Sequence, residues 1–332
     1  AWFSPLAVAS FLIAMVVVHS FIDFIPSVFL GAPEDATVLS ILPGHELLMQ
    51  GRGYRALKLT VIGGVGTFFL SLFLIPIVFV FLENIYETLS KIIAPILIIF
   101  SILFILQERK FKKIFWASII FLLSGALGLV VLNSISVKQP LFPLLSGLFG
   151  ISTLFLSLFN TQKIPKQILA SKIDCFTKSR FLDYFKAALS SLFVSVLPAI
   201  GAAQAAVISR AFTKFKDNED FLVVLGGINT AAALFTLTTL YLIGKARTGV
   251  IAALKDIIEL SFSDYIILIF VCFIAMIFGV ILALKIGRFT AKNISRFNYH
   301  KMSVRVICFI SIIVFFFSGL IGLWILFISS CI

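Results

Sequence analysis

The chain has 332 residues, of which 61% are hydrophobic and 13% charged, and its mean hydropathy is +1.14. A soluble domain has roughly 45–50% apolar and about 25% charged residues, so the composition excludes a soluble protein and predicts an all-α integral membrane protein. The net charge of +12 lies in short segments between apolar runs, where cytoplasmic loops are enriched in Lys and Arg. We therefore expect no nucleic-acid partner, and a multi-pass membrane protein with lipid around it.

Long apolar runs recur along the chain. A helix needs about 20 mainly apolar residues to cross the hydrocarbon core. The uncharged runs near that length are Phe3–Val18, Thr60–Leu82, Ile114–Val137, Gln139–Phe159, Ala187–Ser209, Phe221–Gly244, Tyr265–Leu284 and Val306–Ile332, with Ile92–Leu106 as a shorter one. These runs predict about 8–10 transmembrane elements, some of them half-helices.

The stretch from His19 to Lys58 differs because it combines three prolines with polar and charged side chains. Irregular backbone at membrane depth persists only where it is buried in protein or lines a cavity. We therefore expect a broken, re-entrant hairpin over residues 20–48 and a binding site in it. Its candidate substrate- or ion-binding residues are Pro26, Gly31, Pro33, Glu34, Asp35, Thr37, Ser40, His45 and Arg52.

The adjacent acids Glu34 and Asp35 have two interpretations. Pro33 at a first helical position, followed by acids, is an ordinary helix start. At membrane depth the same carboxylates would be costly and would indicate a proton or cation site. Thr37 and Ser40 would then add hydroxyl oxygens to that site.

Charged residues also flank the hairpin. His45 is either a proton-responsive gate or a polar residue at an interface. Arg52, within Gly51–Gly53, belongs either to an anion-binding loop or to a cytoplasmic anchor, and the loop lacks the preceding strand that a nucleotide motif requires. Earlier in the chain, His19 and Asp23 stand four residues apart on one helical face and can pair.

A second broken segment is predicted in the other half. Pro198 and Gly201 interrupt an apolar run, which predicts a re-entrant hairpin over about residues 187–213. Gln204 lies among alanines; close helix packing explains the alanines but not the amide. Asn229 and Thr230, in the middle of an apolar run, are candidates because polar groups at membrane depth need partners.

Two segments indicate an internal repeat. Residues 60–67 read TVIGGVGT and residues 223–230 read VVLGGINT, so Gly-Gly-x-x-Thr recurs in one register. Upstream, FIPS at 24–27 matches VLPA at 196–199. Paired discontinuous segments in repeats are the sequence sign of a secondary transporter's binding site. The predicted organisation is repeat 1 over residues 1–160, a cytoplasmic linker or amphipathic segment over 161–186, and repeat 2 over 187–332.

Basic loops predict a topology. Segments near residues 52–58, 108–113, 161–186 and 285–305 are rich in Lys and Arg and are expected on the cytoplasmic side. This topology makes the two repeats parallel, whereas many transporters have inverted repeats, and both arrangements stay open at this point.

The sequence contains no motif for catalysis, metal binding or a disulfide framework. The cysteines, at 175, 272, 308 and 331, form no Cys-x-x-Cys pair and no cluster with histidine at ligand spacing. The sequence holds no recognisable nucleophile–base pair either. We expect no enzymatic activity, no cofactor and no metal centre, with Na⁺ or H⁺ coupling open and a Na⁺ site unassigned.

Several motifs resemble one known family. FLGAPEDATVLSILPGH at 29–45, followed by GRGY at 51–54, resembles the signature of the tripartite tricarboxylate transporter large membrane subunit family, in its shorter, mostly archaeal branch. LLSGLFGIST at 144–153 and LPAIGAAQAA at 197–206 are similar too. The resemblance implies a multi-helix permease that takes up tricarboxylates or related anions with an ion gradient, together with a small membrane subunit and a binding protein. The chain departs from the pattern in its shorter length and in Glu34 and Asp35, so citrate and both partner subunits stay open.

Three functions fit these features. The first is a secondary-transporter-like permease for a small organic anion of the carboxylate class, ion-coupled, with alternating access around the two broken hairpins. The second is a translocase for polyprenyl phosphate or another lipid carrier, with Arg52 or Arg55 on the phosphate. The third is a membrane scaffold that transports nothing. A homodimer is compatible with all three.

Overall fold

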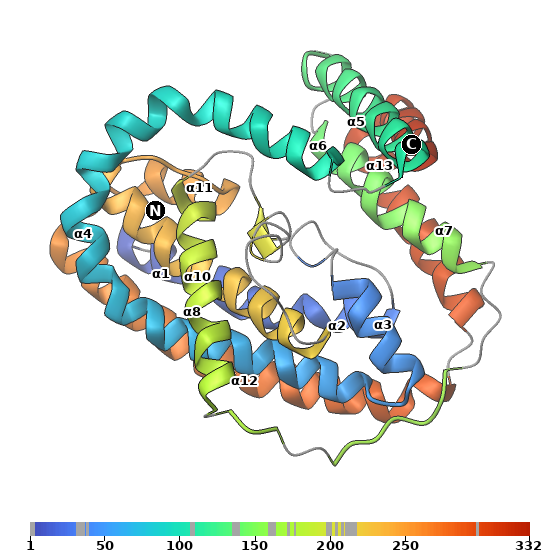
Figure 1. The fold of residues 1–332 in the computed structure, drawn as a ribbon, viewed down its shortest axis with the longest axis horizontal. Coiled ribbons are helices and arrows are strands. Elements are labelled where there is room, and N and C mark those ends of the chain that lie inside the picture. Colours follow the sequence, from blue (N-terminus) through green and yellow to red (C-terminus); the bar gives the residue numbers. More distant parts are fainter. Residues whose placement is uncertain are drawn as a thin grey trace. The chain divides into compact units, whose positions relative to one another are not determined.

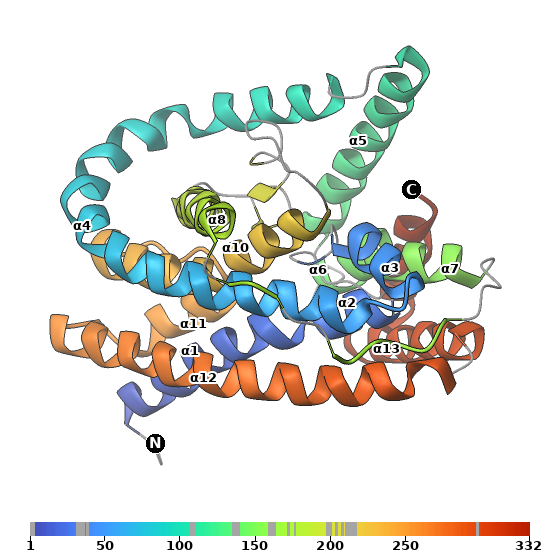
Figure 2. The same cartoon turned by 60° about the horizontal axis from the view of Figure 1, so that its bottom comes forward.

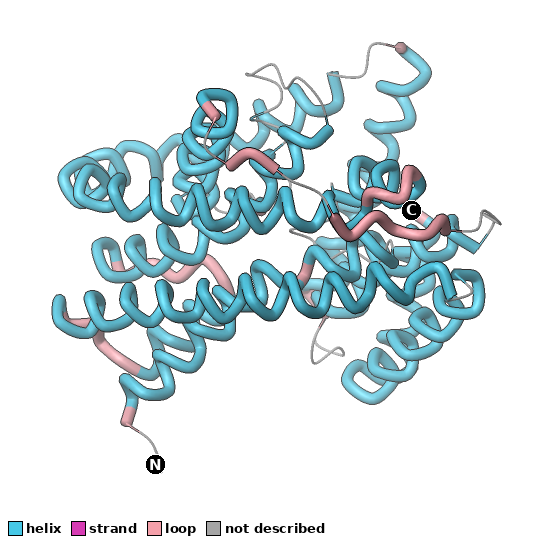
Figure 3. The backbone as a smooth tube through the Cα atoms, turned by 90° about the horizontal axis from the view of Figure 1, so that it is seen from below, coloured by secondary structure: helices cyan, strands magenta, loops and turns pink. Residues whose placement is uncertain are grey.

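The computed structural model covers the 332-residue chain. It describes residues 4–30, 37, 40–106, 110–134, 140–158, 164–170, 173–175, 177–196, 201–202, 205–206, 209, 218–296 and 299–332. These residues form helices joined by short connections, with no strand among them (Figure 3). They divide into two compact units, Ala1–Thr88 with Ile164–Arg296, and Leu89–Lys163 with Phe297–Ile332. Each unit combines segments distant in sequence, and the repeat boundaries predicted above stay a prediction.

Unit 1 is organised around one buried helix. Its elements are α1 (Pro5–Ile22), α2 (Phe24–Leu30), α3 (Ile41–Met49), the first part of α4 (Gly53–Leu106), α8 (Lys178–Val196), α10 (Asn218–Ile243), α11 (Gly249–Ile257), α12 (Phe262–Asn293) and the 3-10 turn η3 (Ile294–Arg296). Most residues of α10 are buried. α1 packs along α12 (Figures 1 and 2), where Gly279 lets the helices approach at Val18 and Phe21.

Unit 2 is built along the C-terminal helix. It contains the end of α4, α5 (Phe111–Leu132), α6 (Leu141–Leu145), the π-helical turn η2 (Ser146–Ile151), α7 (Ser152–Leu158) and α13 (Tyr299–Cys331). α6, η2 and α7 pack against α13, and Gly147 leaves room for Ser329. Most of α5 is exposed, as expected for a helix that faces lipid, because lipid chains are as apolar as leucine.

Six described helical segments are long and apolar enough to cross a membrane. They are Pro5–Leu30, Gly53–Leu82, Phe111–Leu132, Asn218–Ile243, Phe262–Arg296 and Ser303–Cys331, and Phe142–Ile151 is a shorter apolar helix. Residues 187–209 lie partly outside the described residues, so the re-entrant hairpin expected there stays a prediction. The chain is an all-α, multi-pass integral membrane protein, as its composition predicts.

Local sequence explains where these helices begin. Pro5 stands at the first position of α1, where its missing N–H is not needed, and Ser4 caps the helix by accepting from the Ala7 N–H. Ser261 and Asp264 form a capping box at the start of α12, each side chain accepting from the other residue's N–H. These caps satisfy N–H groups that have no partner within the helix.

Pro26 explains the break between α1 and α2. Proline has no N–H to bond the carbonyl of Ile22 four residues earlier, and its ring crowds that carbonyl. α1 accordingly ends at Ile22 and α2 begins at Phe24. Asp23 stands at this break with a helical φ of −61° and ψ of −21°, so α1 and α2 together form one membrane-length segment, Pro5–Leu30. The predicted proline interruption is thus present here. Residues 31–36 and 38–39 of the first hairpin, and 197–200, 203–204, 207–208 and 210–213 of the second, lie outside the described residues.

The two Gly-Gly-x-x-Thr segments pack on each other where α4 meets α10. A methyl group on Gly63 or Gly226 would overlap the backbone of the other helix. Gly64 and Gly227 each adjoin a threonine hydroxyl of the other helix. The contacts are Gly63 with Val223, Gly226 with Thr60, Gly64 with Thr230, and Gly227 with Thr67. When residues 60–67 are aligned with residues 223–230, the contact of Gly63 corresponds to that of Gly226, and the contact of Gly64 to that of Gly227. Such paired contacts are typical of a two-fold interface. The starts of the two helices meet through Arg55 and Glu219, and their later turns meet through Phe79 and Tyr241, so the two helices run parallel.

Candidate functional site

A buried polar cluster lies where the break after α1 meets the middle of α10. The Asp23 side chain is only 4% exposed. The Asn229 Nδ2 atom lies 2.7 Å from Asp23 Oδ2 and 3.3 Å from the Ser20 carbonyl oxygen, so the amide donates to both. The Ser20 hydroxyl lies 3.3 Å from Thr230 Oγ1. A carboxylate, an amide and two hydroxyls thus converge inside a membrane protein.

The first turn of α2 and the following residues extend this cluster. The Ser27 hydroxyl donates to the Asp23 carbonyl at 3.1 Å and lies 2.6 Å from the Thr37 hydroxyl. The Ser40 hydroxyl donates to the Thr37 carbonyl at 2.7 Å. Thr37 and Ser40 are fully buried. We use the name polar centre for Ser20, Asp23, Ser27, Thr37, Ser40, Asn229 and Thr230.

The polar centre is positioned by backbone irregularity on one side and by a continuous helix on the other. Pro26 creates the break that holds Asp23. Asn229 lies near the midpoint of α10 and is partly exposed, although residues 220–228 before it are all buried. Buried polar groups are costly unless hydrogen-bonded, so this grouping is expected to be specific. It offers an incoming ligand hydrogen-bond donors, hydroxyls and one carboxylate.

A second cluster, the charged end, joins the first turns of α4, α8 and α10. Arg55 binds Glu219 through two nitrogens, Nε at 2.8 Å from Oε1 and Nη2 at 2.8 Å from Oε2. Arg52 Nη2 lies 2.6 Å from Glu219 Oε1, and Arg180 Nη1 lies 2.9 Å from Asp220 Oδ1. The charged end is defined by Arg52, Arg55, Arg180, Asp183, Lys186, Glu219 and Asp220.

Helix electrostatics favour this arrangement. Glu219 and Asp220 stand in the first turn of α10, where the helix dipole stabilises negative charge. Arg52 and Arg55 stand at the start of α4, where the dipole disfavours positive charge, and the carboxylate of Glu219 compensates for this. The two-nitrogen contact of Arg55 is the geometry with which arginine also recognises carboxylate ligands.

The Gly51–Gly53 loop is a structural turn rather than an open anion loop. Gly51 has a φ of +75°, which an L side chain rarely adopts. The Gly53 N–H donates to Gln167 Oε1 at 2.8 Å, and Gln167 Nε2 donates to the Leu48 carbonyl at 3.0 Å. The linker segment 164–170 therefore docks on this turn and uses the amide that an anion would need.

The buried carboxyl group of Asp183 makes the folding stability of the protein depend on pH. Burial, followed by the nearby charge of Asp220, raises the pKa of Asp183 to about 6, although Lys186 and Arg180 act against the shift. Between its ordinary value of 3.8 and this value, the folded state binds more protons than the unfolded state, so stability falls as pH rises through this range. We expect the melting temperature of the wild type to fall more steeply from pH 4 to pH 6 than that of Asp183→Asn. Equal slopes would contradict this assignment.

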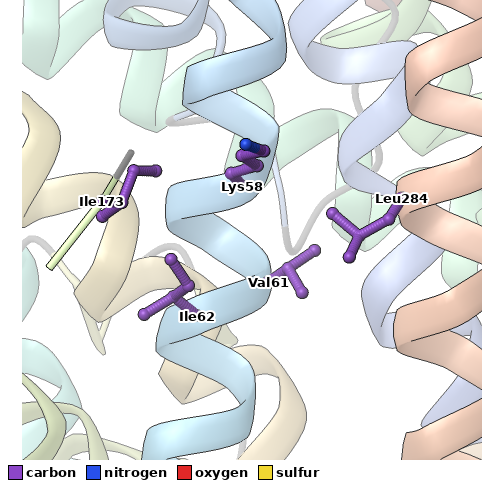
Figure 4. A pocket seen from close by; sticks show the side chains of 5 residues that line it. All are labelled: Lys58, Val61, Ile62, Ile173 and Leu284. Atoms are coloured by element: carbon purple, nitrogen blue, oxygen red, sulfur yellow. The ribbon is translucent and has the colours of Figure 1, made fainter. Parts of the chain in front are cut away.

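A pocket of about 300 Å³ adjoins the first turns of α4 (Figure 4). Its lining is aliphatic except for one cation and consists of Lys58, Val61, Ile62, Ile173 and Leu284. The Lys58 ammonium group also lies 5.1 Å from the centre of the Tyr54 ring. An apolar pocket with a single cation suits an anion that carries a hydrocarbon body.

The structure brings part of the predicted site together. Thr37, Ser40, Asn229 and Thr230 lie in the polar centre, Pro26 shapes it, and Arg52 lies in the charged end. His45 is half-buried on α3, and the Gly201 carbonyl accepts from the Ala205 N–H. The remaining candidates, namely Gly31, Pro33, Glu34, Asp35, Pro198 and Gln204, lie outside the described residues. The binding roles of all these residues stay predictions.

Three residues of the polar centre, Ser20, Asp23 and Ser27, are not among the binding residues predicted from the sequence. The sequence suggests Asp23 only as a partner of His19, although an acid within a long apolar run is itself a sign of function. Ser20 and Ser27 give no signal, because serine is common in membrane helices and usually bonds its own backbone. Their role follows from contacts with residues distant in sequence.

Comparison with known proteins agrees with these features. The sequence profile described as the Tripartite tricarboxylate transporter TctA family matches residues 1–332. The uncharacterized protein MJ1079 of Methanocaldococcus jannaschii is 34% identical over 250 residues, which cover 74% of this chain and 61% of that protein. No solved structure matches the chain. The chain therefore belongs to the tripartite tricarboxylate transporter TctA family, a family of membrane transport components.

Proposed function

We propose that the chain is an ion-coupled permease for a small organic anion of the carboxylate class. The observation that carries the proposal is the polar centre, in which Asp23 and Asn229 meet at a helix break within apolar helices. Intramembrane ionisable groups usually mark substrate or ion pathways, and broken helices form the binding sites of many secondary transporters. Nothing in this chemistry requires an enzyme or an organic cofactor.

The charged end supplies a gate in this proposal. It joins segments of both halves of the chain through Arg52, Arg55 and Glu219, and the segment around Arg52 and Arg55 is expected on the cytoplasmic side. Alternating access requires such contacts to form in one state and to break in the other. A carboxylate that leaves the polar centre can compete with Glu219 for the arginines, because both ligands offer the same planar group.

The partners follow from the family. Its description names a tripartite transporter, so we propose a small membrane subunit and a binding protein as partners of this chain. A homodimer is equally compatible with the exposed apolar faces of α5 and α13.

One observation favours a second candidate, a translocase for polyprenyl phosphate. The pocket of Figure 4 combines Lys58 with Val61, Ile62 and Leu284, which suits a phosphate head on a hydrocarbon chain. Basic pockets between membrane helices on the cytoplasmic side bind lipid head groups. A non-transporting scaffold is the third candidate.

Uptake by proteoliposomes separates these functions. The purified full chain is reconstituted, and labelled citrate, succinate and other di- and tricarboxylates are offered with a proton gradient, a Na⁺ gradient or neither. The proposal predicts uptake of at least one carboxylate above protein-free liposomes, and more uptake with a gradient. Transfer of polyprenyl phosphate between leaflets, without carboxylate uptake, would favour the translocase. The absence of both carboxylate uptake and polyprenyl phosphate transfer would favour the scaffold.

A further inference from the structure

Asp23 has the position expected of a proton carrier. Its side chain is 4% exposed, it occupies the break after α1, and it meets Asn229 near the middle of α10. We propose that Asp23 binds the coupling proton of the transport cycle. This inference rests on the proposed function, since it names the ion that drives the permease and the group that carries it.

A negative charge on Asp23 is costly because this residue lies within a membrane-length helical segment. A carboxylate within a membrane helix is expensive, and it is retained where it pairs with another group or carries protons along a pathway. A carboxyl group can lower this cost by binding a proton in one state and releasing it in another. Asn229, directly beside Asp23, is partly exposed, and in this proposal water reaches the carboxyl group there.

The group that faces the Asp23 carboxylate favours a proton over Na⁺. The Ser20 carbonyl can only accept a hydrogen bond, so the Asn229 group 3.3 Å from it is the NH₂ end of the amide. The same NH₂ group faces Asp23 Oδ2 at 2.7 Å. Hard cations require converging oxygens, whereas this carboxylate faces a donor. A donor stabilises the ionised carboxylate and leaves room for a proton in its neutral form.

The neighbouring hydroxyls support the same choice. The Ser20 hydroxyl lies 2.8 Å from the Val17 carbonyl, and the Ser27 hydroxyl donates to the Asp23 carbonyl at 3.1 Å. These bonds direct both hydroxyl hydrogens to backbone carbonyls and not to the Asp23 carboxyl group. Groups of three or more His, Cys, Asp or Glu side chains that could hold a metal are absent from the described part of the chain. In the proposed transport cycle, Asp23 binds one proton on one side of the membrane and releases it on the other side.

Other titratable and charged groups lie on the elements packed against the polar centre. Those that the structure describes are His19 on α1, His45 and Glu46 on α3, Tyr54, Arg55, Lys58 and Tyr86 on α4, Glu219, Asp220 and Tyr241 on α10, Lys255 and Asp256 on α11, and Asp264, Tyr265, Cys272, Lys285, Arg288 and Lys292 on α12. Glu219 is bound by Arg52 and Arg55, and Glu46 accepts from Asn218. They define the background against which the titration of Asp23 is measured.

The first test measures protonation without any substrate. Infrared difference spectra of the purified full chain are recorded across pH 4 to 9, and the carboxylic C=O band is followed. We expect Asp23→Asn to remove one titrating carboxyl component and Asn229→Leu to change the pH range of that component, because the carboxyl group loses its hydrogen-bond partner. Asp183→Asn serves as the matched control and removes a different component. A spectrum that Asp23→Asn leaves unchanged would overturn the proposal.

The second test uses the labelled carboxylates in proteoliposomes. Thr236→Val, whose hydroxyl bonds the backbone of its own helix, should keep accumulation driven by a proton gradient within about twofold of the wild type, and size-exclusion chromatography shows whether each variant is folded. Asp23→Asn should lose that accumulation. Accumulation that persists in this variant, or wild-type accumulation driven by Na⁺ alone, would overturn the proton assignment. A wild type that titrates Asp23 but exchanges no carboxylate would refute the transport function while leaving the proton site standing.

Discussion

Gly63→Ala is expected to destabilise the protein strongly. A methyl group at this position would overlap the carbonyl of Val223 on α10, which is backbone and cannot rotate away. The two helices would have to separate, and overpacking of this kind costs about 1–3 kcal/mol or more. Gly226→Ala should act alike, because its methyl group would overlap the Thr60 carbonyl on α4.

Two comparisons make this expectation sharp. Gly125 lies in α5, and a methyl group added there would meet no neighbouring atom within 4 Å. Gly125→Ala should therefore be neutral or slightly stabilising, as alanine favours helices by about 1 kcal/mol over glycine. The double variant of Gly63 and Gly226 should cost less than the sum of the single variants, since either methyl already separates the helices. The melting temperature of each variant in detergent, monitored by size-exclusion chromatography, tests both the Gly125→Ala control and the double variant. Equal stability of Gly63→Ala and Gly125→Ala would contradict the close crossing.

The second large effect is expected for Glu219→Gln. This change leaves Arg52 and Arg55 without their shared carboxylate, at a helix start where positive charge is disfavoured. Hydrogen bonds to charged groups contribute about 1.5–3 kcal/mol each at most sites, and Glu219 is 13% exposed, so solvent replaces them only in part. We expect a lower melting temperature in the same assay.

A matched control and a rescue accompany this prediction. Asp256 is an exposed acid on α11, and Asp256→Asn should change stability by less than about 0.5 kcal/mol. Exchanging the charges, with Arg55→Glu and Glu219→Arg together, should recover part of the loss caused by either change alone. If Glu219→Gln behaves like Asp256→Asn, the ion pairs of the charged end do not hold α4 and α10 together.

The sequence predicts the class of fold because membrane helices follow from local composition. Apolar runs and the break at Pro26 are properties of a few neighbouring residues, and both are found where they are expected. The Gly-Gly-x-x-Thr repeat goes further. It indicates two equivalent positions, and the structure adds that these positions, around Gly63 and Gly226, contact each other.

The candidate site is less predictable because its contacts are distant in sequence. Asn229 and Thr230 are unusual in an apolar run and can be selected from sequence alone. Their partners Ser20 and Asp23 lie more than 200 residues earlier, and no local pattern joins them. Glu219 likewise reads as an ordinary acid at a helix start, and only the tertiary structure places it on Arg52 and Arg55.

The central claim is that the polar centre is the site through which the anion passes. Carboxylate uptake by proteoliposomes that contain Asn229→Leu tests it most directly, with Thr236→Val as control. Thr236 lies on the same helix and is buried, but its hydroxyl bonds only the backbone of its own helix. We predict that Asn229→Leu lowers uptake at least about tenfold, equivalent to about 1.4 kcal/mol, while Thr236→Val stays near the wild type. Wild-type uptake by Asn229→Leu would contradict the claim.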